Sequence, residues 1–286
     1  METLTSIADL HDRVARRRDR GQRIGFVPTM GNLHAGHLRL IEHARAAADV
    51  VVASIYVNPL QFGPSEDFSA YPRTLEADRE RLAGAGAQLL FAPGDVEIYP
   101  RGPQAQTTVE VPGVSDILCG RFRPGHFRGV TTVVNRLLNL VQPHVAVFGK
   151  KDYQQLLVIR LMVEDLGMPV AVEGVETVRE PDGLACSSRN AYLDAAQRRV
   201  APRLYATLQD VATAVRSARG AGREDLERAR ERLSAAGFRP EYLEVRRRSD
   251  LAPAGSGDRE LVVLGAAWLG RTRLIDNLEV SLNGKG

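Results

Sequence analysis

The sequence is poor in cysteine: 286 residues include only two, Cys119 and Cys186. They form neither a Cys-x-x-Cys pair nor any other metal-ligand spacing, which excludes a disulfide framework and a cysteine-based metal site. A reduced, cytoplasmic setting is therefore expected. The sequence also lacks an apolar run of about 18 residues and a basic-then-apolar leader at Met1. We expect neither export nor a membrane partner.

A strong excess of one charge is also missing. The formal net charge is +3, and the arginines fall in short runs, such as 16–20 and 246–248. Such runs are typical of solvated helix faces. Aromatic residues do not alternate with basic ones as they do where bases are stacked. Nucleic acid is therefore not expected as a partner, although an RNA-binding protein with a degenerate nucleotide site remains an alternative. The sequence has no Gly-x-Gly-x-x-Gly, which disfavours a dinucleotide dehydrogenase.

The first 176 residues alternate between apolar strand-like segments and amphipathic helices. We expect strands at 23–28, 50–57, 88–92, 144–148 and 169–175, and helices at 4–19, 33–48, 74–84 and 130–141, with another helix after Gly149. The run from Val50 to Val57 is continuously apolar and rich in β-branched residues, as in buried parallel strands. This alternation predicts an α/β fold with a parallel sheet.

The pattern changes near residue 177. Two helices are expected at 194–217 and 223–236, followed by strands at 241–245, 260–264 and 273–276. We therefore predict two domains: 1–176, built on the parallel sheet, and 177–286, a smaller α+β domain. The segment 62–73, with two prolines and two acidic residues, is expected to be a flap over the site or an ordinary surface loop.

The strongest functional signal is the stretch around His34. The apolar segment 23–27 precedes it and helical spacing follows it, so His34, Gly36 and His37 fall at a strand-to-helix turn. The N-terminus of a helix offers unpaired N–H groups and a partial positive charge to phosphate oxygens. Two imidazoles beside it can follow charge that develops on a phosphate. The alternative is that His34 is a surface residue and His37 a packing residue.

Two further polar clusters lie at expected loop positions. The first, 149–152, follows a predicted strand and contains Lys151, a mobile charge for an outer phosphate, and Asp152, an acceptor for ribose hydroxyls. The second, 187–189, combines two hydroxyl groups with the planar fork of Arg189. Each cluster alone is common in proteins. Together with the His34 turn they favour a nucleoside triphosphate as ligand.

Six motifs in order resemble the pantothenate synthetase family, whose members are pantoate–β-alanine ligases of the His-x-Gly-His nucleotidyltransferase superfamily. They span nearly the whole chain: Pro28-Thr-Met-Gly-Asn-Leu-His-Ala-Gly-His37, Asn58-Pro-Leu-Gln-Phe62, Arg123-Pro-Gly-His-Phe-Arg-Gly129, Phe148-Gly-Lys-Lys-Asp-Tyr-Gln-Gln155, Asp182-Gly-Leu-Ala-Cys-Ser-Ser-Arg-Asn190 and Ala266-Ala-Trp-Leu-Gly-Arg-Thr-Arg-Leu-Ile-Asp-Asn277. The resemblance implies a Rossmann-like first domain, a second domain that closes over the ATP site, a homodimer and Mg²⁺. It also implies that pantoate and β-alanine are condensed through a pantoyl adenylate, with release of AMP and pyrophosphate.

The resemblance also assigns residues. It implies catalytic roles for His34, His37 and Lys151, with His37 as a proton donor or as one of two charge-stabilising imidazoles. The implied ATP-binding residues are Met30, Gly31, His34, Gly36, His37, Gly149, Lys150, Lys151, Asp152, Val178, Cys186, Ser187, Ser188 and Arg189. Gln61 and Gln155 are the implied pantoate-binding pair, and Gln61 is also implied to bind β-alanine.

Some positions match the family less well. Cys186 stands where the family often has Met or another apolar residue, a change that packing against adenine tolerates. Asp78 is the nearest match to an acidic magnesium ligand. Arg123 and His126 lie in a matching motif without an assigned role, and placing the substrates and packing at the dimer interface are both open. A nucleotidyltransferase that keeps the nucleotide on its product is the alternative within enzymes.

Overall fold

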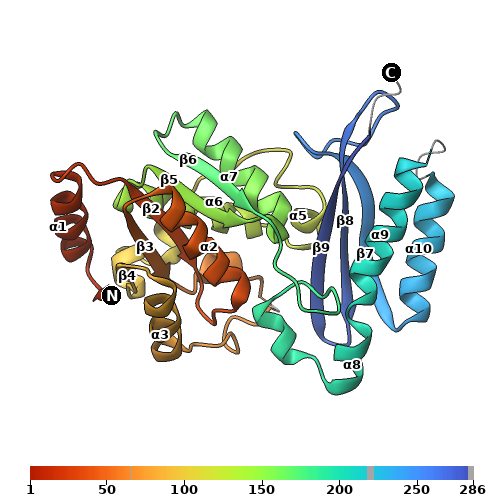
Figure 1. The fold of residues 1–286 in the computed structure, drawn as a ribbon, viewed down its shortest axis with the longest axis horizontal. Coiled ribbons are helices and arrows are strands. Elements are labelled where there is room, and N and C mark those ends of the chain that lie inside the picture. The colour runs from red at the N-terminus through yellow and green to blue at the C-terminus, as the bar shows by residue number, and fades with distance from the viewer. Residues whose placement is uncertain (65, 218–221, 283–286) are drawn as a thin grey trace. The chain divides into compact units, whose positions relative to one another are not determined.

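A computed structural model describes residues 1–64, 66–217 and 222–282 (Figure 1). The chain forms two compact units. The first comprises Met1–Lys150 and Gln155–Glu176, and the second comprises Lys151–Gln154 and Thr177–Gly286. A short segment that carries Lys151 thus belongs to the second unit, although it lies within the first part of the sequence.

The first unit is built on a parallel sheet of six strands in the order β1-β4-β3-β2-β5-β6. The strands are β1 (Glu2–Leu4), β2 (Ile24–Thr29), β3 (Val50–Ile55), β4 (Leu89–Phe91), β5 (Val145–Gly149) and β6 (Ala171–Val175). The predicted α/β fold with a parallel sheet is confirmed.

Helices cover both faces of this sheet. The helices of this unit are α1 (Ile7–Arg18), α2 (Ala35–Ala47), α3 (Leu75–Ala85), α4 (Asp95–Ile98), α5 (Cys119–Phe122), α6 (His126–Val141) and α7 (Tyr153–Asp165). Buried residues of α2 and α3 pack in one core cluster with one side of the strands. Because side chains alternate between the faces of a strand, α1 and α6, which contact each other and β2, cover the opposite face.

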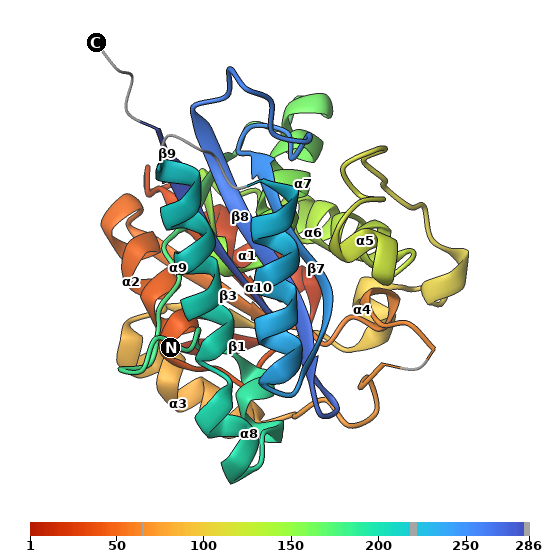
Figure 2. The same cartoon turned by 90° about the vertical axis from the view of Figure 1, so that its right-hand side faces the viewer.

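The second unit contains a three-stranded antiparallel sheet, in the order β7-β8-β9. Its elements are α8 (Ala195–Val200), α9 (Arg203–Arg216), α10 (Arg223–Ala235), β7 (Phe238–Arg247), β8 (Glu260–Leu269) and β9 (Thr272–Ser281). Figure 2 shows α9 and α10 side by side across one face of the sheet, and their buried residues share a core with it. The predicted smaller α+β architecture is confirmed.

Several element boundaries were predicted wrongly. Residues 2–4 form an edge strand, so the helix expected from residue 4 begins only at Ile7, where the Ser6 hydroxyl accepts a hydrogen bond from Asp9 N–H at 3.1 Å. The helix expected over 194–217 is two helices, because Pro202 has no N–H to continue the first. Helix α6 begins at His126 and not at 130, and the last three strands have 10 residues each.

The strand order places a topological switch point between β2 and β5. From β2 the chain continues outward to β3 and β4, whereas β5 continues to β6 on the other side. The pairing of β2 with β5 stops at Phe26, two residues before Pro28, which cannot donate a ladder hydrogen bond. Ligands of open α/β sheets bind at the carboxyl ends of the strands beside such a point. The turns after Thr29 and Gly149 lie there.

Within the described residues, we find no helix that is both long and apolar enough to span a bilayer.

Candidate active site

A buried carboxylate shapes the turn between β2 and α2. Asp78 of α3 is fully buried and accepts hydrogen bonds from the backbone N–H groups of Asn32 and Leu33, each at 2.8 Å, and from the Thr74 hydroxyl at 3.0 Å. Gly31 (φ 79°) and Asn32 (φ 50°) adopt the left-handed conformation in this turn. A side chain on Gly31 would approach the Asp78 carboxylate at 3.1 Å. Asp78 therefore fixes the backbone conformation of the turn.

These contacts give Asp78 a positioning role that sequence patterns did not indicate. The expected magnesium ligation by Asp78 stays a prediction, although its carboxylate already has three donors as partners. Among residues 1–64, 66–217 and 222–282, no group of three or more His, Cys, Asp or Glu side chains is arranged to hold a metal ion. The protein itself thus offers no cage of metal ligands in the part that the structure describes.

His34 and His37 form the N-terminus of α2. His34 is the N-cap residue, and its Nδ1 accepts a hydrogen bond from Gly36 N–H at 3.1 Å. The Nδ1 of His37 accepts one from the backbone N–H of His34 at 3.3 Å, so the two side chains build a reciprocal capping box. The ring centroids are 4.1 Å apart. Because Nδ1 of each neutral ring is an acceptor, its proton lies on Nε2. Each Nε2–H is then a donor suited to a phosphate oxygen.

Gln61 lies in a buried hydrogen-bond network at the carboxyl end of β3. Its Oε1 accepts a hydrogen bond from Asn58 Nδ2 at 3.0 Å. The same amide of Asn58 donates to the carbonyl of Gly129 at 3.0 Å, and its Oδ1 accepts from the Tyr99 hydroxyl at 2.8 Å. Asn58 is fully buried. It therefore fixes the amide of Gln61 with its oxygen as an acceptor, which leaves the NH₂ group as the part that can donate to a substrate.

Gly129 permits the close approach of α6 to the Pro59–Gln61 turn. A Cβ atom at this position would lie 2.0 Å from the carbonyl oxygen of Leu60, a distance that no side chain can occupy. The short approach is what brings the Gly129 carbonyl within reach of Asn58. Gly129 ends the third motif of the sequence, and the structure gives that position a steric reason.

Arg123 and His126, which had no role from the sequence, hold the same turn from the other side. Arg123 Nη2 and His126 Nδ1 contact the carbonyl of Gln61 at 3.2 and 2.8 Å. Arg123 also forms a two-point ion pair with Glu66, with both N–O distances 2.6 Å. Burial alone would raise the pKa of Glu66, but the hydrogen bonds and charge of Arg123 outweigh it and lower that pKa. The pair ties part of the 62–73 loop to the end of α5, just before α6. Residue 65 lies outside the described residues, and the expectation of a flap stays a prediction.

The other predicted residues of the first unit lie at or near the carboxyl ends of β2 and β5. Gly149 is the last residue of β5, and Lys150, which follows it, forms an ion pair with Glu176. Gln155 lies half-buried in the first turn of α7. Met30 is half-buried directly after β2, beside Gly31. The structure thus places Met30 and Gly149 at the ends of β2 and β5, the strands that flank the switch point.

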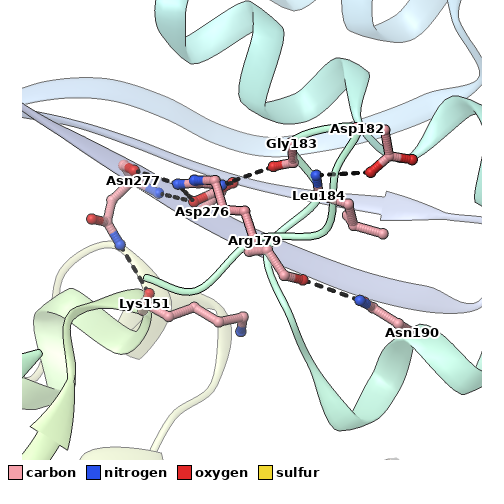
Figure 3. Close-up of polar contacts among 9 residues, drawn as sticks. Lys151, Arg179, Asp182, Gly183, Leu184, Asn190, Asp276 and Asn277 are labelled. Carbon is pink, nitrogen blue, oxygen red and sulfur yellow. Dashed lines mark hydrogen bonds and ion pairs between the residues drawn. The ribbon is translucent and has the colours of Figure 1, made fainter. Parts of the chain in front are cut away.

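The remaining predicted residues belong to the second unit. Lys151 and Asp152 form one segment, and Val178 with 186–189 forms another. Cys186 N–H donates to the Val178 carbonyl at 2.9 Å, and the Ser187 hydroxyl accepts from Arg189 N–H at 3.3 Å. Figure 3 shows two residues absent from our predictions: Asn277, which donates to the Lys151 carbonyl, and Arg179, which donates to the Gly183 carbonyl and to Asp276. Their only sequence signal was membership of the last motif or proximity to Val178.

The chain is similar to known proteins over nearly its whole length. A family model described as Pantoate-beta-alanine ligase matches residues 2–279. The chain is 58% identical over 287 residues to a protein named pantothenate synthetase from Pseudomonas paraeruginosa, covering 99% of this chain and 100% of that protein. A pantothenate synthetase from Azotobacter vinelandii is 57% identical, with the same coverage.

Solved structures agree in fold. The crystal structure of pantothenate synthetase from Thermus thermophilus is 49% identical, with a TM-score of 0.91, and the match covers 98% of this chain and all of that one. A pantoate-β-alanine ligase from Francisella tularensis, complexed with β,γ-ATP and β-alanine, is 33% identical with a TM-score of 0.82 and 97% coverage of both chains.

Proposed function

The chain belongs to the pantoate–β-alanine ligase family, and from this premise we propose that it joins pantoate to β-alanine in a reaction driven by ATP. The products are pantothenate, AMP and pyrophosphate. The observation that carries the proposal is the pair of imidazoles at the N-terminus of α2, beside the switch point of the sheet, in a chain that matches this family over residues 2–279. A site of this kind suits the transfer of a nucleotidyl group.

The reaction needs activation because a carboxylate is a poor electrophile towards an amine. In the first step a carboxylate oxygen of pantoate attacks the α-phosphorus of ATP. The P–O bond to pyrophosphate breaks as the new P–O bond forms, giving pantoyl adenylate. In the second step the amine of β-alanine attacks the acyl carbon, AMP leaves with the electron pair of the broken C–O bond, and the amine loses one proton.

Both partners of the first step are anionic, so the protein has to offset their repulsion. We assign His34 and His37 to the phosphates of ATP, since Nε2–H donors and the positive end of the α2 dipole favour developing negative charge. Lys151 adds a mobile positive charge. This role fits the fixed Nδ1 acceptors of the two rings, which leave Nε2 as the proton-bearing atom.

Further residues are assigned to the nucleotide, as the likeness to the family implies. They are Met30, Gly31, Gly36, Gly149, Lys150, Asp152, Val178, Cys186, Ser187, Ser188 and Arg189. Burial and the charge of Glu180 raise the pKa of the Cys186 thiol, despite the opposing charges of Lys151 and Arg179. The thiol is therefore neutral at pH 7 and suits contact with a purine, as an apolar side chain would.

Pantoate is assigned to Gln61 and Gln155, and the β-alanine side also to Gln61. Neutral amides orient a carboxylate without locking it in an ion pair that would reduce its reactivity. The Asn58 network supports this assignment because it fixes the oxygen of Gln61 and leaves its NH₂ as the donor.

We propose that magnesium enters as the Mg²⁺–ATP complex, as part of the substrate. The described residues hold no cluster of three His, Cys, Asp or Glu side chains that could bind a metal. Mg²⁺ in such sites keeps waters and phosphate oxygens as its main ligands. We also propose a homodimer. The cytoplasmic setting inferred from the cysteines stays a prediction.

A direct product analysis tests the proposal. The purified protein is incubated with ATP, Mg²⁺, pantoate and β-alanine, and nucleotides and acids are separated by chromatography. We expect pantothenate, AMP and pyrophosphate in equal amounts. A product that retains the nucleotide would favour the alternative nucleotidyltransferase. Retention on heparin at moderate salt, with no turnover, would favour the RNA-binding alternative.

A further inference from the structure

Two adjacent residues of β9 hold parts of the second unit that we assign to ATP: Asn277 contacts the Lys151 segment, and Asp276 contacts Arg179, in the hairpin that carries Val178 and Cys186. The exposed fractions of Asp276 and Asn277 are 5% and 7%. Buried polar side chains need hydrogen-bond partners, so the identity of those partners shows what the pair holds in place. Both residues belong to the last motif of the sequence, to which no role has been assigned.

Asn277 holds the segment that carries Lys151. Its Nδ2 donates to the carbonyl oxygen of Lys151 at 2.9 Å (Figure 3). Two residues further along β9, Glu279 accepts a hydrogen bond from the Tyr153 hydroxyl at 3.1 Å. The strand thus fixes the 151–154 segment at two points. Because the ammonium of Lys151 ends a flexible stem, the reach of that charge depends on where its backbone is held.

Asp276 holds the second segment through Arg179. The two carboxylate oxygens accept hydrogen bonds from Nη1 and Nη2 of Arg179 at 2.6 and 2.8 Å. The same guanidinium donates to the Gly183 carbonyl at 3.1 Å and stacks on Tyr205, 3.4 Å from its ring centroid. Such a two-point pair fixes direction as well as distance.

Arg179 lies in the short hairpin that carries the predicted nucleotide contacts. It pairs with Ala185 across the hairpin, one residue from Val178 on one arm and one from Cys186 on the other. Asp276 therefore determines the position of Val178 and of the chain that continues into 187–189.

The contacts that Asp276 and Asn277 make with the two segments share one carboxylate oxygen. The backbone N–H of Asn277 donates to Oδ1 of Asp276 at 2.8 Å, so one carboxylate oxygen serves both Arg179 and the residue that holds Lys151. The pKa of Cys186 responds to the charges of both Lys151 and Arg179, as expected where the two segments face each other.

We infer that Asp276 and Asn277 are positioning residues, which align the Lys151 segment with the 186–189 segment for the nucleotidyl transfer. The inference rests on the proposed role of Lys151. Neither side chain has to touch a substrate to act in this way. The inference predicts that removing the Asn277 side chain displaces Lys151 and so impairs the first chemical step. Pantoate binding should be unaffected.

A double-mutant cycle on Asn277 and Lys151 tests this inference. Steady-state kinetics are measured for Asn277→Ala, Lys151→Ala and the double variant. We expect Asn277→Ala to lower kcat about 10²-fold, the cost of a misplaced catalytic group. The KM for pantoate should stay within about twofold of wild type, and the double variant should be no slower than Lys151→Ala, because coupled residues are not additive. Asn277→Gln, which keeps the amide, should recover part of the loss.

Ser281→Ala is the matched control, since Ser281 lies on the same strand and its hydroxyl contacts Glu260. It should leave all constants unchanged. Circular dichroism and thermal melting of each variant separate misfolding from misplacement. If Asn277→Ala does not fold, Asn277→Asp, which keeps the size of the side chain but loses the Nδ2 donor to Lys151, takes its place in the cycle.

Four outcomes decide between the assignments. Fully additive losses in folded variants, or a wild-type kcat for Asn277→Ala, would overturn the inference. A wild-type kcat for Lys151→Ala would instead remove Lys151 from the proposed mechanism, a distinct failure. A strongly raised pantoate KM for Asn277→Ala would also overturn the inference, since it places the effect at another site.

Discussion

The backbone N–H of His34 donates to Nδ1 of His37, while Nδ1 of His34 caps the same helix through Gly36. In each imidazole Nδ1 thus accepts a hydrogen bond at the helix start, and Nε2 carries the proton. Structure and chemistry are combined in one pair of side chains, and substitutions can separate them.

His34→Asn is the most informative substitution at this site. Asn is among the best N-cap residues, so the helix start should survive, whereas His34→Ala should cost about 1 kcal/mol of stability. We expect both variants to lose about 10²–10³-fold in kcat, the scale of one lost transition-state donor. His37→Ala should lose a similar factor. Measurement of kcat beside urea unfolding checks this, and near-wild-type turnover of His34→Asn would limit His34 to capping.

Lys151→Ala and Gln155→Ala should differ in which constant they change. Lys151 follows phosphate charge, so its loss should reduce kcat and raise the KM for ATP together. Gln155 orients a carboxylate, so its loss should mainly raise the KM for pantoate. Initial rates measured over a range of ATP and pantoate concentrations give kcat and the KM for each of the two substrates. A rise in the ATP KM alone for Gln155→Ala would show that the two clusters had been assigned to the wrong substrates.

Gly129→Ala should be far more damaging than its size suggests. The added Cβ would lie 2.0 Å from the Leu60 carbonyl and push α6 away from the turn that carries Gln61. We expect a loss of several kcal/mol in stability or, if the protein folds, a raised KM for pantoate. Gly84→Ala is the control: it lies in α3 with no atom within 4 Å of the new Cβ, and should be neutral or stabilising by about 0.5–1 kcal/mol.

The Glu66–Arg123 pair should make stability depend on pH in a defined direction. Glu66 has a lowered pKa in the folded chain, so its contribution is present above its ordinary pKa and is lost as the pH falls through the folded value. We expect Glu66→Gln to be less stable than wild type at pH 7. The difference should shrink as the pH falls below the ordinary pKa of a glutamate and through the lowered folded value, where the wild-type carboxyl also becomes neutral. Urea midpoints measured along this pH series provide the check, and a difference that stays constant would contradict the pKa direction.

How far the sequence predicts the fold depends on how local the signal is. The continuous apolar run that begins at Val50 identifies a buried parallel strand, and the structure has β3 there. The edge strand Glu2–Leu4 has three residues and pairs with Leu89 to Phe91, so nothing in its own sequence distinguishes it from the start of a helix. Pro202 is a sequence signal for a helix break, but apolar residues keep helical spacing on both sides of it. The spacing therefore predicts one continuous helix where the structure has two.

The candidate site divides in the same way. His34 and His37 are predictable because the strand, the turn and the helix adjoin them in sequence. Asp78 and Asn277 act on residues more than 40 positions away, through hydrogen bonds that leave no periodic pattern. Arg123 and His126 belonged to a visible motif, but their role follows only from their contacts with the Gln61 carbonyl. The residues that perform chemistry at a turn can be predicted from the adjacent sequence. The residues that support the turn can be identified only once the fold is known.

The order of the two chemical steps is the last prediction. Pantoate and ATP should react before β-alanine binds, giving enzyme-bound pantoyl adenylate and pyrophosphate. The reason is positional: the assigned phosphate-binding residues serve attack at the α-phosphorus, and none of them is a covalent nucleophile for an acyl-enzyme route, since the raised pKa keeps the Cys186 thiol protonated. Isotope exchange between labelled pyrophosphate and ATP measures the first step alone. It should require enzyme, Mg²⁺ and pantoate, proceed without β-alanine, and fall in His34→Asn by the factor seen in kcat. Exchange that needs β-alanine would favour a concerted route, and formation of ADP and phosphate would exclude the adenylate.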